Sequence, residues 1–244
     1  MNTPTVVLVH GAFADATSWN GVISRLHDKG ITSLGVANPL RSVSVDAAYL
    51  RDVLDSIEGP VVLVGHSYGG FVITEAGSHP AVKALVYVAA FAPDSGENAF
   101  ELSTKFPGSS LGDALNAYPV ATGGNEFAIR REMFRDQFAA DVPVETAGLM
   151  GATQRPVTEK ALTEPLPTAA PAWKGLPSWF VYGELDRNIP AELERFFVER
   201  AKPVASCELA GSSHAPSVSR PAEVTDVILE AVAHVASAAD RSAA

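Results

Sequence analysis

The sequence has little of three features that mark particular classes of protein. It has one cysteine, Cys207, among 244 residues, so no disulfide can form within the chain. Its longest uninterrupted apolar run spans residues 84–92, far short of the roughly 20 residues of a membrane-spanning helix. No basic segment followed by an apolar stretch precedes the first strand-like run. These absences predict a cytoplasmic protein that does not insert into a membrane.

Basic charge is also scarce. The 18 Lys and Arg residues are outnumbered by 28 Asp and Glu residues, which gives a net charge of −10. Without a basic cluster, nucleic acid and anionic membranes are poor partners. No spacing of Cys and His is typical of a metal site, and no glycine-rich dinucleotide loop follows the first strand. We therefore expect no metal and no cofactor.

The pattern of apolar residues predicts an α/β fold. Apolar residues make up 47% of the chain, and its length suits one large domain. Strand-like runs alternate with helix-like segments, which predicts a mostly parallel central sheet with helices on both faces. The strands are expected at residues 5–10, 31–37, 60–66, 82–89, 177–183 and 203–210, and the helices at 17–29, 45–58, 68–79, 190–201 and 221–236.

Residues 94–171 interrupt this alternation, since they are rich in Gly, Pro and Ser and carry few strand signals. We therefore expect a core made of residues 1–93 and 172–244, with residues 94–171 as a small cap insertion. Residues 126–138 are predicted as a helix with Phe127, Met133, Phe134 and Phe138 on one side. That stripe docks the cap on the core or lines a substrate site. On the second interpretation, Phe127 and Phe134 contact substrate.

The segment Gly65-His66-Ser67-Tyr68-Gly69 carries the strongest functional signal in the chain. It matches G-x-S-x-G, follows the buried strand-like run Val61 to Val64, and precedes a helix-like segment. Strand, sharp turn and helix form the context in which this motif exposes a nucleophilic serine. Glycines two residues to either side avoid collisions with the adjoining strand and helix. Ser67 is therefore the predicted nucleophile.

A nucleophilic serine needs a base, and three histidines follow it in the chain. His79 lies at the far end of the helix that starts at the serine, and His234 lies in an amphipathic C-terminal segment. His214 occupies a Gly/Ser-rich loop between a strand-like and a helix-like run, from which it can reach the serine. We expect His214 to be the base.

The base in turn needs an acid, and two carboxylates follow the predicted strand 177–183. Carboxylates just past a strand end lie where an open α/β sheet collects its functional groups. Glu184 directly follows the strand-ending glycine, whereas Asp186 lies far enough into the loop to turn back towards His214. Asp186 is the favoured acid and Glu184 the alternative.

Donors to a developing oxyanion are expected from the first strand and from the serine turn. Gly11 lets the chain turn after the strand, so that the backbone N–H of Ala12 points into the site together with that of Tyr68. Phe13, which follows directly, is a candidate substrate contact. His10 and His66 precede sharp turns, and we expect structural hydrogen bonds from both.

With these motifs in this order along the sequence, the chain resembles the α/β-hydrolase superfamily over nearly its whole length. The resemblance is greatest to the small branch that contains plant methyl-ester esterases and hydroxynitrile lyases, which also opens with a strand leading to His-Gly. The lyases typically carry a threonine after the first strand and a lysine after the catalytic histidine. Gly11 and Ala215 stand at those positions here, which favours the esterase side. The serine at position 67 argues against dehalogenases and epoxide hydrolases, which use an aspartate.

The predicted function is that of a serine hydrolase acting on a small, mostly apolar carboxylic ester or lactone through Ser67, His214 and Asp186. The aromatic cap and the lack of a cluster for a charged head group motivate this substrate class. Four alternatives stay open on the same fold: a ligand-sensing protein with slow turnover, a hydroxynitrile lyase, a cofactor-free oxygenase and a perhydrolase.

Overall fold

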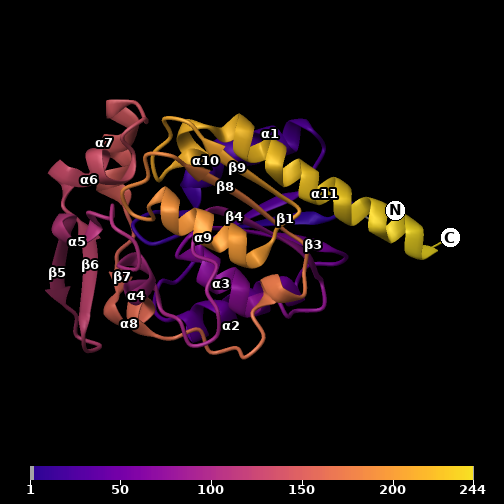
Figure 1. The fold of residues 1–244 in the computed structure, drawn as a ribbon, viewed down its shortest axis with the longest axis horizontal. Coiled ribbons are helices and arrows are strands. Elements are labelled where there is room, and N and C mark those ends of the chain that lie inside the picture. Colours follow the sequence, from indigo (N-terminus) through magenta and orange to yellow (C-terminus); the bar gives the residue numbers. More distant parts are fainter. Residues whose placement is uncertain (1–2, 244) are drawn as a thin grey trace.

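The computed structural model describes residues 3–243 and the side chains of residues 3–238. Figure 1 shows the order of the elements along the chain. The strands are β1 (Thr5–Val9), β2 (Ser33–Val36), β3 (Val61–Ser67), β4 (Val82–Ala90), β5 (Leu115–Pro119), β6 (Asn125–Ile129), β7 (Val157–Thr158), β8 (Ser178–Gly183) and β9 (Ala205–Leu209). The helices are η1 (Ala16–Trp19), α1 (Asn20–Asp28), α2 (Val43–Asp55), α3 (Gly69–Ala76), α4 (Ala99–Ser103), α5 (Leu111–Ala114), α6 (Arg131–Phe138), α7 (Val144–Thr153), α8 (Glu159–Thr163), η2 (Ala172–Lys174), α9 (Ala191–Ala201), α10 (Pro216–Ser219) and α11 (Pro221–Ala243).

Six strands form one sheet in the order β2-β1-β3-β4-β8-β9, and every neighbouring pair is parallel. Both β3 and β8 are buried along their whole length, as expected for strands covered on two faces. The predicted α/β class with a parallel central sheet is confirmed. The order also brings the carboxyl ends of β3, β4 and β8 together at one edge, where functional groups of such sheets gather.

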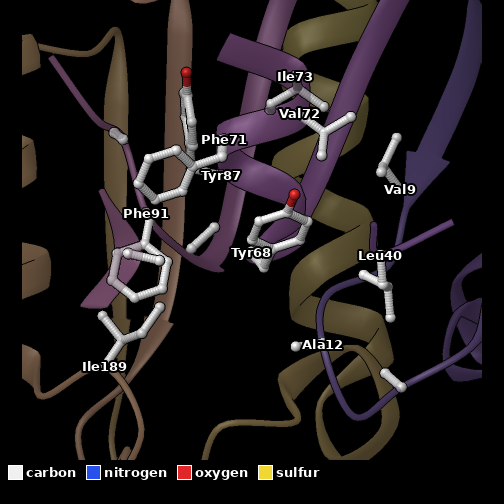
Figure 2. Packing of buried hydrophobic residues seen from close by; sticks show 14 of the residues in the cluster. Val9, Ala12, Leu40, Tyr68, Phe71, Val72, Ile73, Tyr87, Phe91 and Ile189 are labelled. Carbon is white, nitrogen blue, oxygen red and sulfur yellow. The ribbon is translucent and has the colours of Figure 1, made fainter. Parts of the chain in front are cut away.

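Alternation along each strand divides the core into two layers. In β1, Val6 and Leu8 pack with α1 and α11 on one face, whereas Val7 and Val9 pack with α2, α3 and α9 on the other. Figure 1 shows α1 and α11 together on one side of the sheet and α2 and α3 on the opposite side. The layer next to α3 is aromatic: Tyr68, Phe71 and Phe91 pack side by side at the end of β3 and β4 (Figure 2).

Residues 94–171, called the insertion below, lie between β4 and η2 and contain a second, three-stranded sheet in the order β5-β6-β7. These strands were not predicted, because the segment carries few strand signals. The structure also corrects the predicted helix over residues 126–138, because the helical part, α6, begins only at Arg131. Phe127 lies on β6, opposite Ala117 of β5.

The missed signal is the pair Gly123-Gly124, whose φ values of 94° and 76° form the turn between β5 and β6. Two consecutive glycines between short segments are typical of a hairpin. The insertion is tied to the core at several points, among them the ion pair between Arg41 and Glu126 and the hydrogen bond from the Thr158 hydroxyl to the Arg41 carbonyl, 2.6 Å. Across residues 3–243, none of the helices combines the length and the apolar character needed to cross a bilayer.

Candidate active site

Ser67 is the last residue of β3, and its φ of 54° puts it in the left-handed region. Non-glycine residues adopt this conformation at a cost, and such residues cluster at functional sites. The flanking glycines permit the turn. A Cβ on Gly65 would lie 2.8 Å from the Gly69 carbonyl oxygen, and one on Gly69 would lie 2.6 Å from the Val9 carbonyl oxygen. The turn therefore holds the serine hydroxyl at the edge of the sheet.

His214 reaches the serine from the loop after β9. Its Nε2 lies 2.9 Å from the Ser67 Oγ. The ring is buried, with Phe138 packed edge-on at a centroid distance of 4.9 Å. The other two candidates lie elsewhere: His79 bonds Asp55 at 3.0 Å, and His234 packs against Trp179. Only His214 of the three is brought to Ser67.

Asp186 completes the chain of hydrogen bonds. Its Oδ2 lies 2.6 Å from Nδ1 of His214, and its Oδ1 accepts the amides of Asn188 and Ile189 at 2.7 and 2.9 Å. The alternative acid, Glu184, is exposed and accepts the amide of Gly211 instead. The structure thus brings Asp186, and not Glu184, to the histidine.

His66 is a neutral support for the base. Its Nε2–H donates to the His214 carbonyl at 2.8 Å, so its Nδ1 carries no proton. Burial, with the nearby His214 ring as a smaller cause, lowers the pKa of His66 to about 3. His10 is fixed in the same way, because Nδ1–H donates to the Gly11 carbonyl and Nε2 accepts the Asn38 amide. Burial lowers the pKa of His10 too.

The amides of Ala12 and Tyr68 donate no hydrogen bond to any group among residues 3–243. Both residues are buried and line the same cavity as Ser67. Buried backbone donors are almost always paired, so two free ones beside a nucleophile suit a negatively charged oxygen. Gly11 permits the approach, because a Cβ there would lie 2.6 Å from the Ser67 Cβ.

The hydroxyl end of the Tyr68 side chain is anchored to α2. Its hydroxyl donates to Oδ2 of Asp46 at 2.9 Å, and Oδ1 of Asp46 accepts the Arg41 amide at 3.0 Å. Burial raises the pKa of Asp46 and that of Tyr68. The bond orients the residue whose amide faces the cavity.

The cavity beside Ser67 has a volume of about 410 Å³, and most of its lining comes from residues 99–115 of the insertion. Asp113 is the one charged residue that lines it, and the other side chains are apolar or carry hydroxyls. Of the three predicted substrate contacts, Phe13 lines the cavity. Phe127 and Phe134 do not, which corrects that prediction. Phe134 instead stacks on Phe138 at 5.1 Å, behind the His214 ring.

Sequence analysis did not identify the residues that form the wall of the cavity, among them Phe100, Phe106 and Leu111. Their only signal is that they are scattered apolar residues within a Gly/Pro/Ser-rich segment that follows β4. It also did not identify Glu194 on α9, whose side chain is fully buried with both carboxylate oxygens unpaired within residues 3–238. Burial, and then the charge of Asp186, raise the pKa of Glu194 well above its usual value.

No group of three or more His, Cys, Asp or Glu side chains among the described residues is arranged to hold a metal ion. The polar groups that meet at the site are Ser67, His214, Asp186 and the two free amides.

Comparison with known proteins gives three informative similarities. Methylesterase 8 of Arabidopsis thaliana is 24% identical over 245 residues, covering 91% of this chain and 87% of that protein. A carbendazim hydrolyzing esterase of Nocardioides sp. (strain SG-4G) is 35% identical over 113 residues, covering 41% of this chain and 47% of that protein. The crystal structure of polyneuridine aldehyde esterase superposes with a TM-score of 0.79 at 21% identity, covering 94% and 99% of the two chains.

The last similarity, at that identity, shows the fold. This chain spans only between 47% and 64% of the length of three of the curated relatives that match it. A sequence profile described as the alpha/beta hydrolase family matches residues 6–227. The chain belongs to the alpha/beta hydrolase family, and its resemblance to the branch of the plant methylesterases is confirmed.

Proposed function

We propose that this chain is a serine carboxylic ester hydrolase that works through an acyl-enzyme. The observation that carries the proposal is the hydrogen-bonded chain Ser67–His214–Asp186, at 2.9 and 2.6 Å, beside two unpaired backbone amides. Nucleophile, base, orienting acid and oxyanion donors are the parts that acyl transfer requires. The names of the relatives, methylesterase and esterase, support the same chemistry.

In the first half of the reaction, the Ser67 Oγ attacks the ester carbonyl while Nε2 of neutral His214 takes its proton. Asp186 holds the imidazole with Nδ1–H towards the carboxylate and stabilises the imidazolium that forms. The amides of Ala12 and Tyr68 donate to the oxyanion, where losing one donor typically costs about 100- to 1000-fold in rate. His214 then protonates the departing alkoxide.

In the second half, water attacks the acyl-enzyme with His214 again as the base, and the acid product leaves. No step requires a group other than those of this chain and water.

The proposed substrate is a small, mostly apolar carboxylic ester or lactone. A cavity of about 410 Å³ suits a small molecule, and its single charged lining residue, Asp113, disfavours anionic substrates. The aromatic residues Phe91, Phe100 and Phe106 supply apolar surface for an acyl or alcohol group.

The test is the hydrolysis of p-nitrophenyl esters from acetate to octanoate by wild type and Ser67→Ala. We expect turnover by the wild type with an initial burst of p-nitrophenol, and turnover lower by about 10³-fold or more in Ser67→Ala. A wild type that is inert across the series, or a Ser67→Ala protein that is equally active, would overturn the proposal.

A further inference from the structure

A second cavity, of about 450 Å³, lies where η1 and the start of α1 meet α7. Like the catalytic cavity, it has one charged lining residue, here Asp15, whose carboxylate is already bound by the amide and hydroxyl of Thr17. Apolar side chains such as Leu149 and Met150 line the rest, together with hydroxyl-bearing side chains and the uncharged amides of Asn20 and Gln154. Its chemistry therefore suits an uncharged, largely apolar group.

Phe13 is the one residue that lines both cavities. Its side chain is 3% exposed and belongs to the aromatic core layer. Its main chain is fixed from two sides: Ala12 precedes it in the turn after β1, and its own amide donates to the Arg155 carbonyl of the insertion at 3.1 Å. Phe13 is therefore a buried residue with a fixed main chain at the place where the two cavities approach each other.

The backbone of Phe13 is unusual for such a residue. Its φ of 60° lies in the left-handed region, which glycine adopts freely and a bulky residue adopts only at a cost. Residues kept in such conformations cluster at ligand-binding and catalytic positions. A phenyl ring at a position that would suit glycine indicates that the ring itself has a role.

Resting on the proposed esterase activity, we propose that Phe13 sets the largest ester that the enzyme accepts, by closing the catalytic cavity against the second cavity. The second cavity is then a blocked subsite for an uncharged alkyl or aryl group. Because Phe13 directly follows the predicted oxyanion donor Ala12, the passage from the catalytic cavity to this subsite would start beside the reacting carbonyl. Shortening the ring joins the two cavities and admits longer esters.

The experiment measures kcat/KM for two series, p-nitrophenyl esters from acetate to dodecanoate and alkyl butyrates from methyl to octyl, in wild type, Phe13→Ala and Phe13→Leu. Phe13→Leu keeps most of the core packing and secures a folded variant. Each buried methylene is worth about fourfold in binding, so we expect the ratio of long to short esters to rise at least about tenfold in one of the series. The smaller effect is expected in Phe13→Leu.

A second substitution tests whether the gain uses the second cavity. In Phe13→Ala, adding Leu149→Trp puts bulk into that cavity and is expected to return the preference to short esters. Adding Val204→Trp instead, at an exposed position that lines neither cavity, is expected to keep the preference for long esters. If wild type turns over esters but the preference is unchanged in both Phe13 variants, the role of Phe13 is refuted. If wild type turns over no ester, the proposed function is refuted.

Discussion

Replacing Asp186 by asparagine has an outcome that follows from the hydrogen bonds around it. Oδ1 of Asp186 accepts two amides, from Asn188 and Ile189, at 2.7 and 2.9 Å. In Asp186→Asn the amide oxygen must keep that place, because an NH₂ group there would leave both buried donors unpaired at about 1–3 kcal/mol each. The new NH₂ group therefore faces Nδ1 of His214.

An NH₂ group can only donate, so Nδ1 becomes an acceptor and the imidazole proton moves to Nε2. Nε2 is the atom 2.9 Å from the Ser67 Oγ, and once protonated it cannot take the serine proton. We expect kcat for p-nitrophenyl butyrate to fall about 10³- to 10⁴-fold, equal to about 4–5 kcal/mol of transition-state stabilisation. KM stays within about threefold, since Asp186 does not line the catalytic cavity.

The matched control is Glu184→Gln, which changes a neighbouring carboxylate that bonds Gly211 and does not touch His214. Its kcat is expected within about threefold of the wild type, because no group of the reaction is altered. An Asp186→Asn variant that kept a tenth or more of the wild-type kcat, or a Glu184→Gln variant whose kcat fell as far, would refute this role of Asp186. Circular dichroism of both variants verifies that they are folded.

Three further predictions concern stability. A Cβ on Gly70 would overlap the Phe91 carbonyl oxygen, so Gly70→Ala is expected to lower the free energy of unfolding by more than about 3 kcal/mol. Gly148 lies on α7 with open space around it, so Gly148→Ala is expected to raise the free energy of unfolding by about 0.5–1 kcal/mol. Urea denaturation measures both changes. The pKa of His66 is lowered to about 3 in the folded protein. The contribution of the neutral imidazole to the free energy of unfolding is therefore full above pH 6.5 and is lost as the pH falls towards 3. Between pH 7 and pH 4 that loss amounts to about 3 kcal/mol, and it should shrink in His66→Gln, as measured by denaturation at these two pH values. The pKa of Glu194 is raised by burial, so the wild type loses stability as the pH rises above 4.5, and Glu194→Gln is expected to flatten that decline between pH 5 and pH 8. Equal slopes in Glu194→Gln and wild type would contradict this.

The parts of the fold that follow from local sequence were predictable. The buried apolar runs of β1, β3, β4 and β8 fit few conformations other than a strand. Their predicted bounds differ from the observed ones by no more than one residue at either end. The turn at Ser67 was predictable for the same reason, because strand, glycines and helix lie within a few residues of one another.

To predict the place of Asp186 and His214, it was enough to assume that the loops after parallel strands meet at one edge of the sheet. The structure brings His214 to Ser67 and Asp186 to His214, and the hydrogen bond of 2.6 Å that favours Asp186 over Glu184 is contained in no sequence pattern. What could not be predicted depends on contacts distant in sequence. The cavity wall at Phe100 and Phe106 meets Ala12 and Tyr68 only through the folding of the insertion.

The error at residues 126–138 has a similar cause. Phe127 and Phe134 have a spacing that fits one side of a helix, so the apolar pattern of the whole segment was assigned to one element. The pairing of β6 with both β5 and β7 decides the conformation of Phe127, and Gly123-Gly124 is the local signal that favours it.

We expect Ser67 to become covalently acylated during turnover. Intact-protein mass spectrometry of the enzyme quenched in acid within milliseconds of mixing with p-nitrophenyl butyrate tests this directly. We expect a mass increase of one butyryl group that maps to the peptide containing Ser67 and is absent in Ser67→Ala. Turnover of the ester without an adduct on that peptide, or an adduct that persists in Ser67→Ala, would show that Ser67 is not the nucleophile.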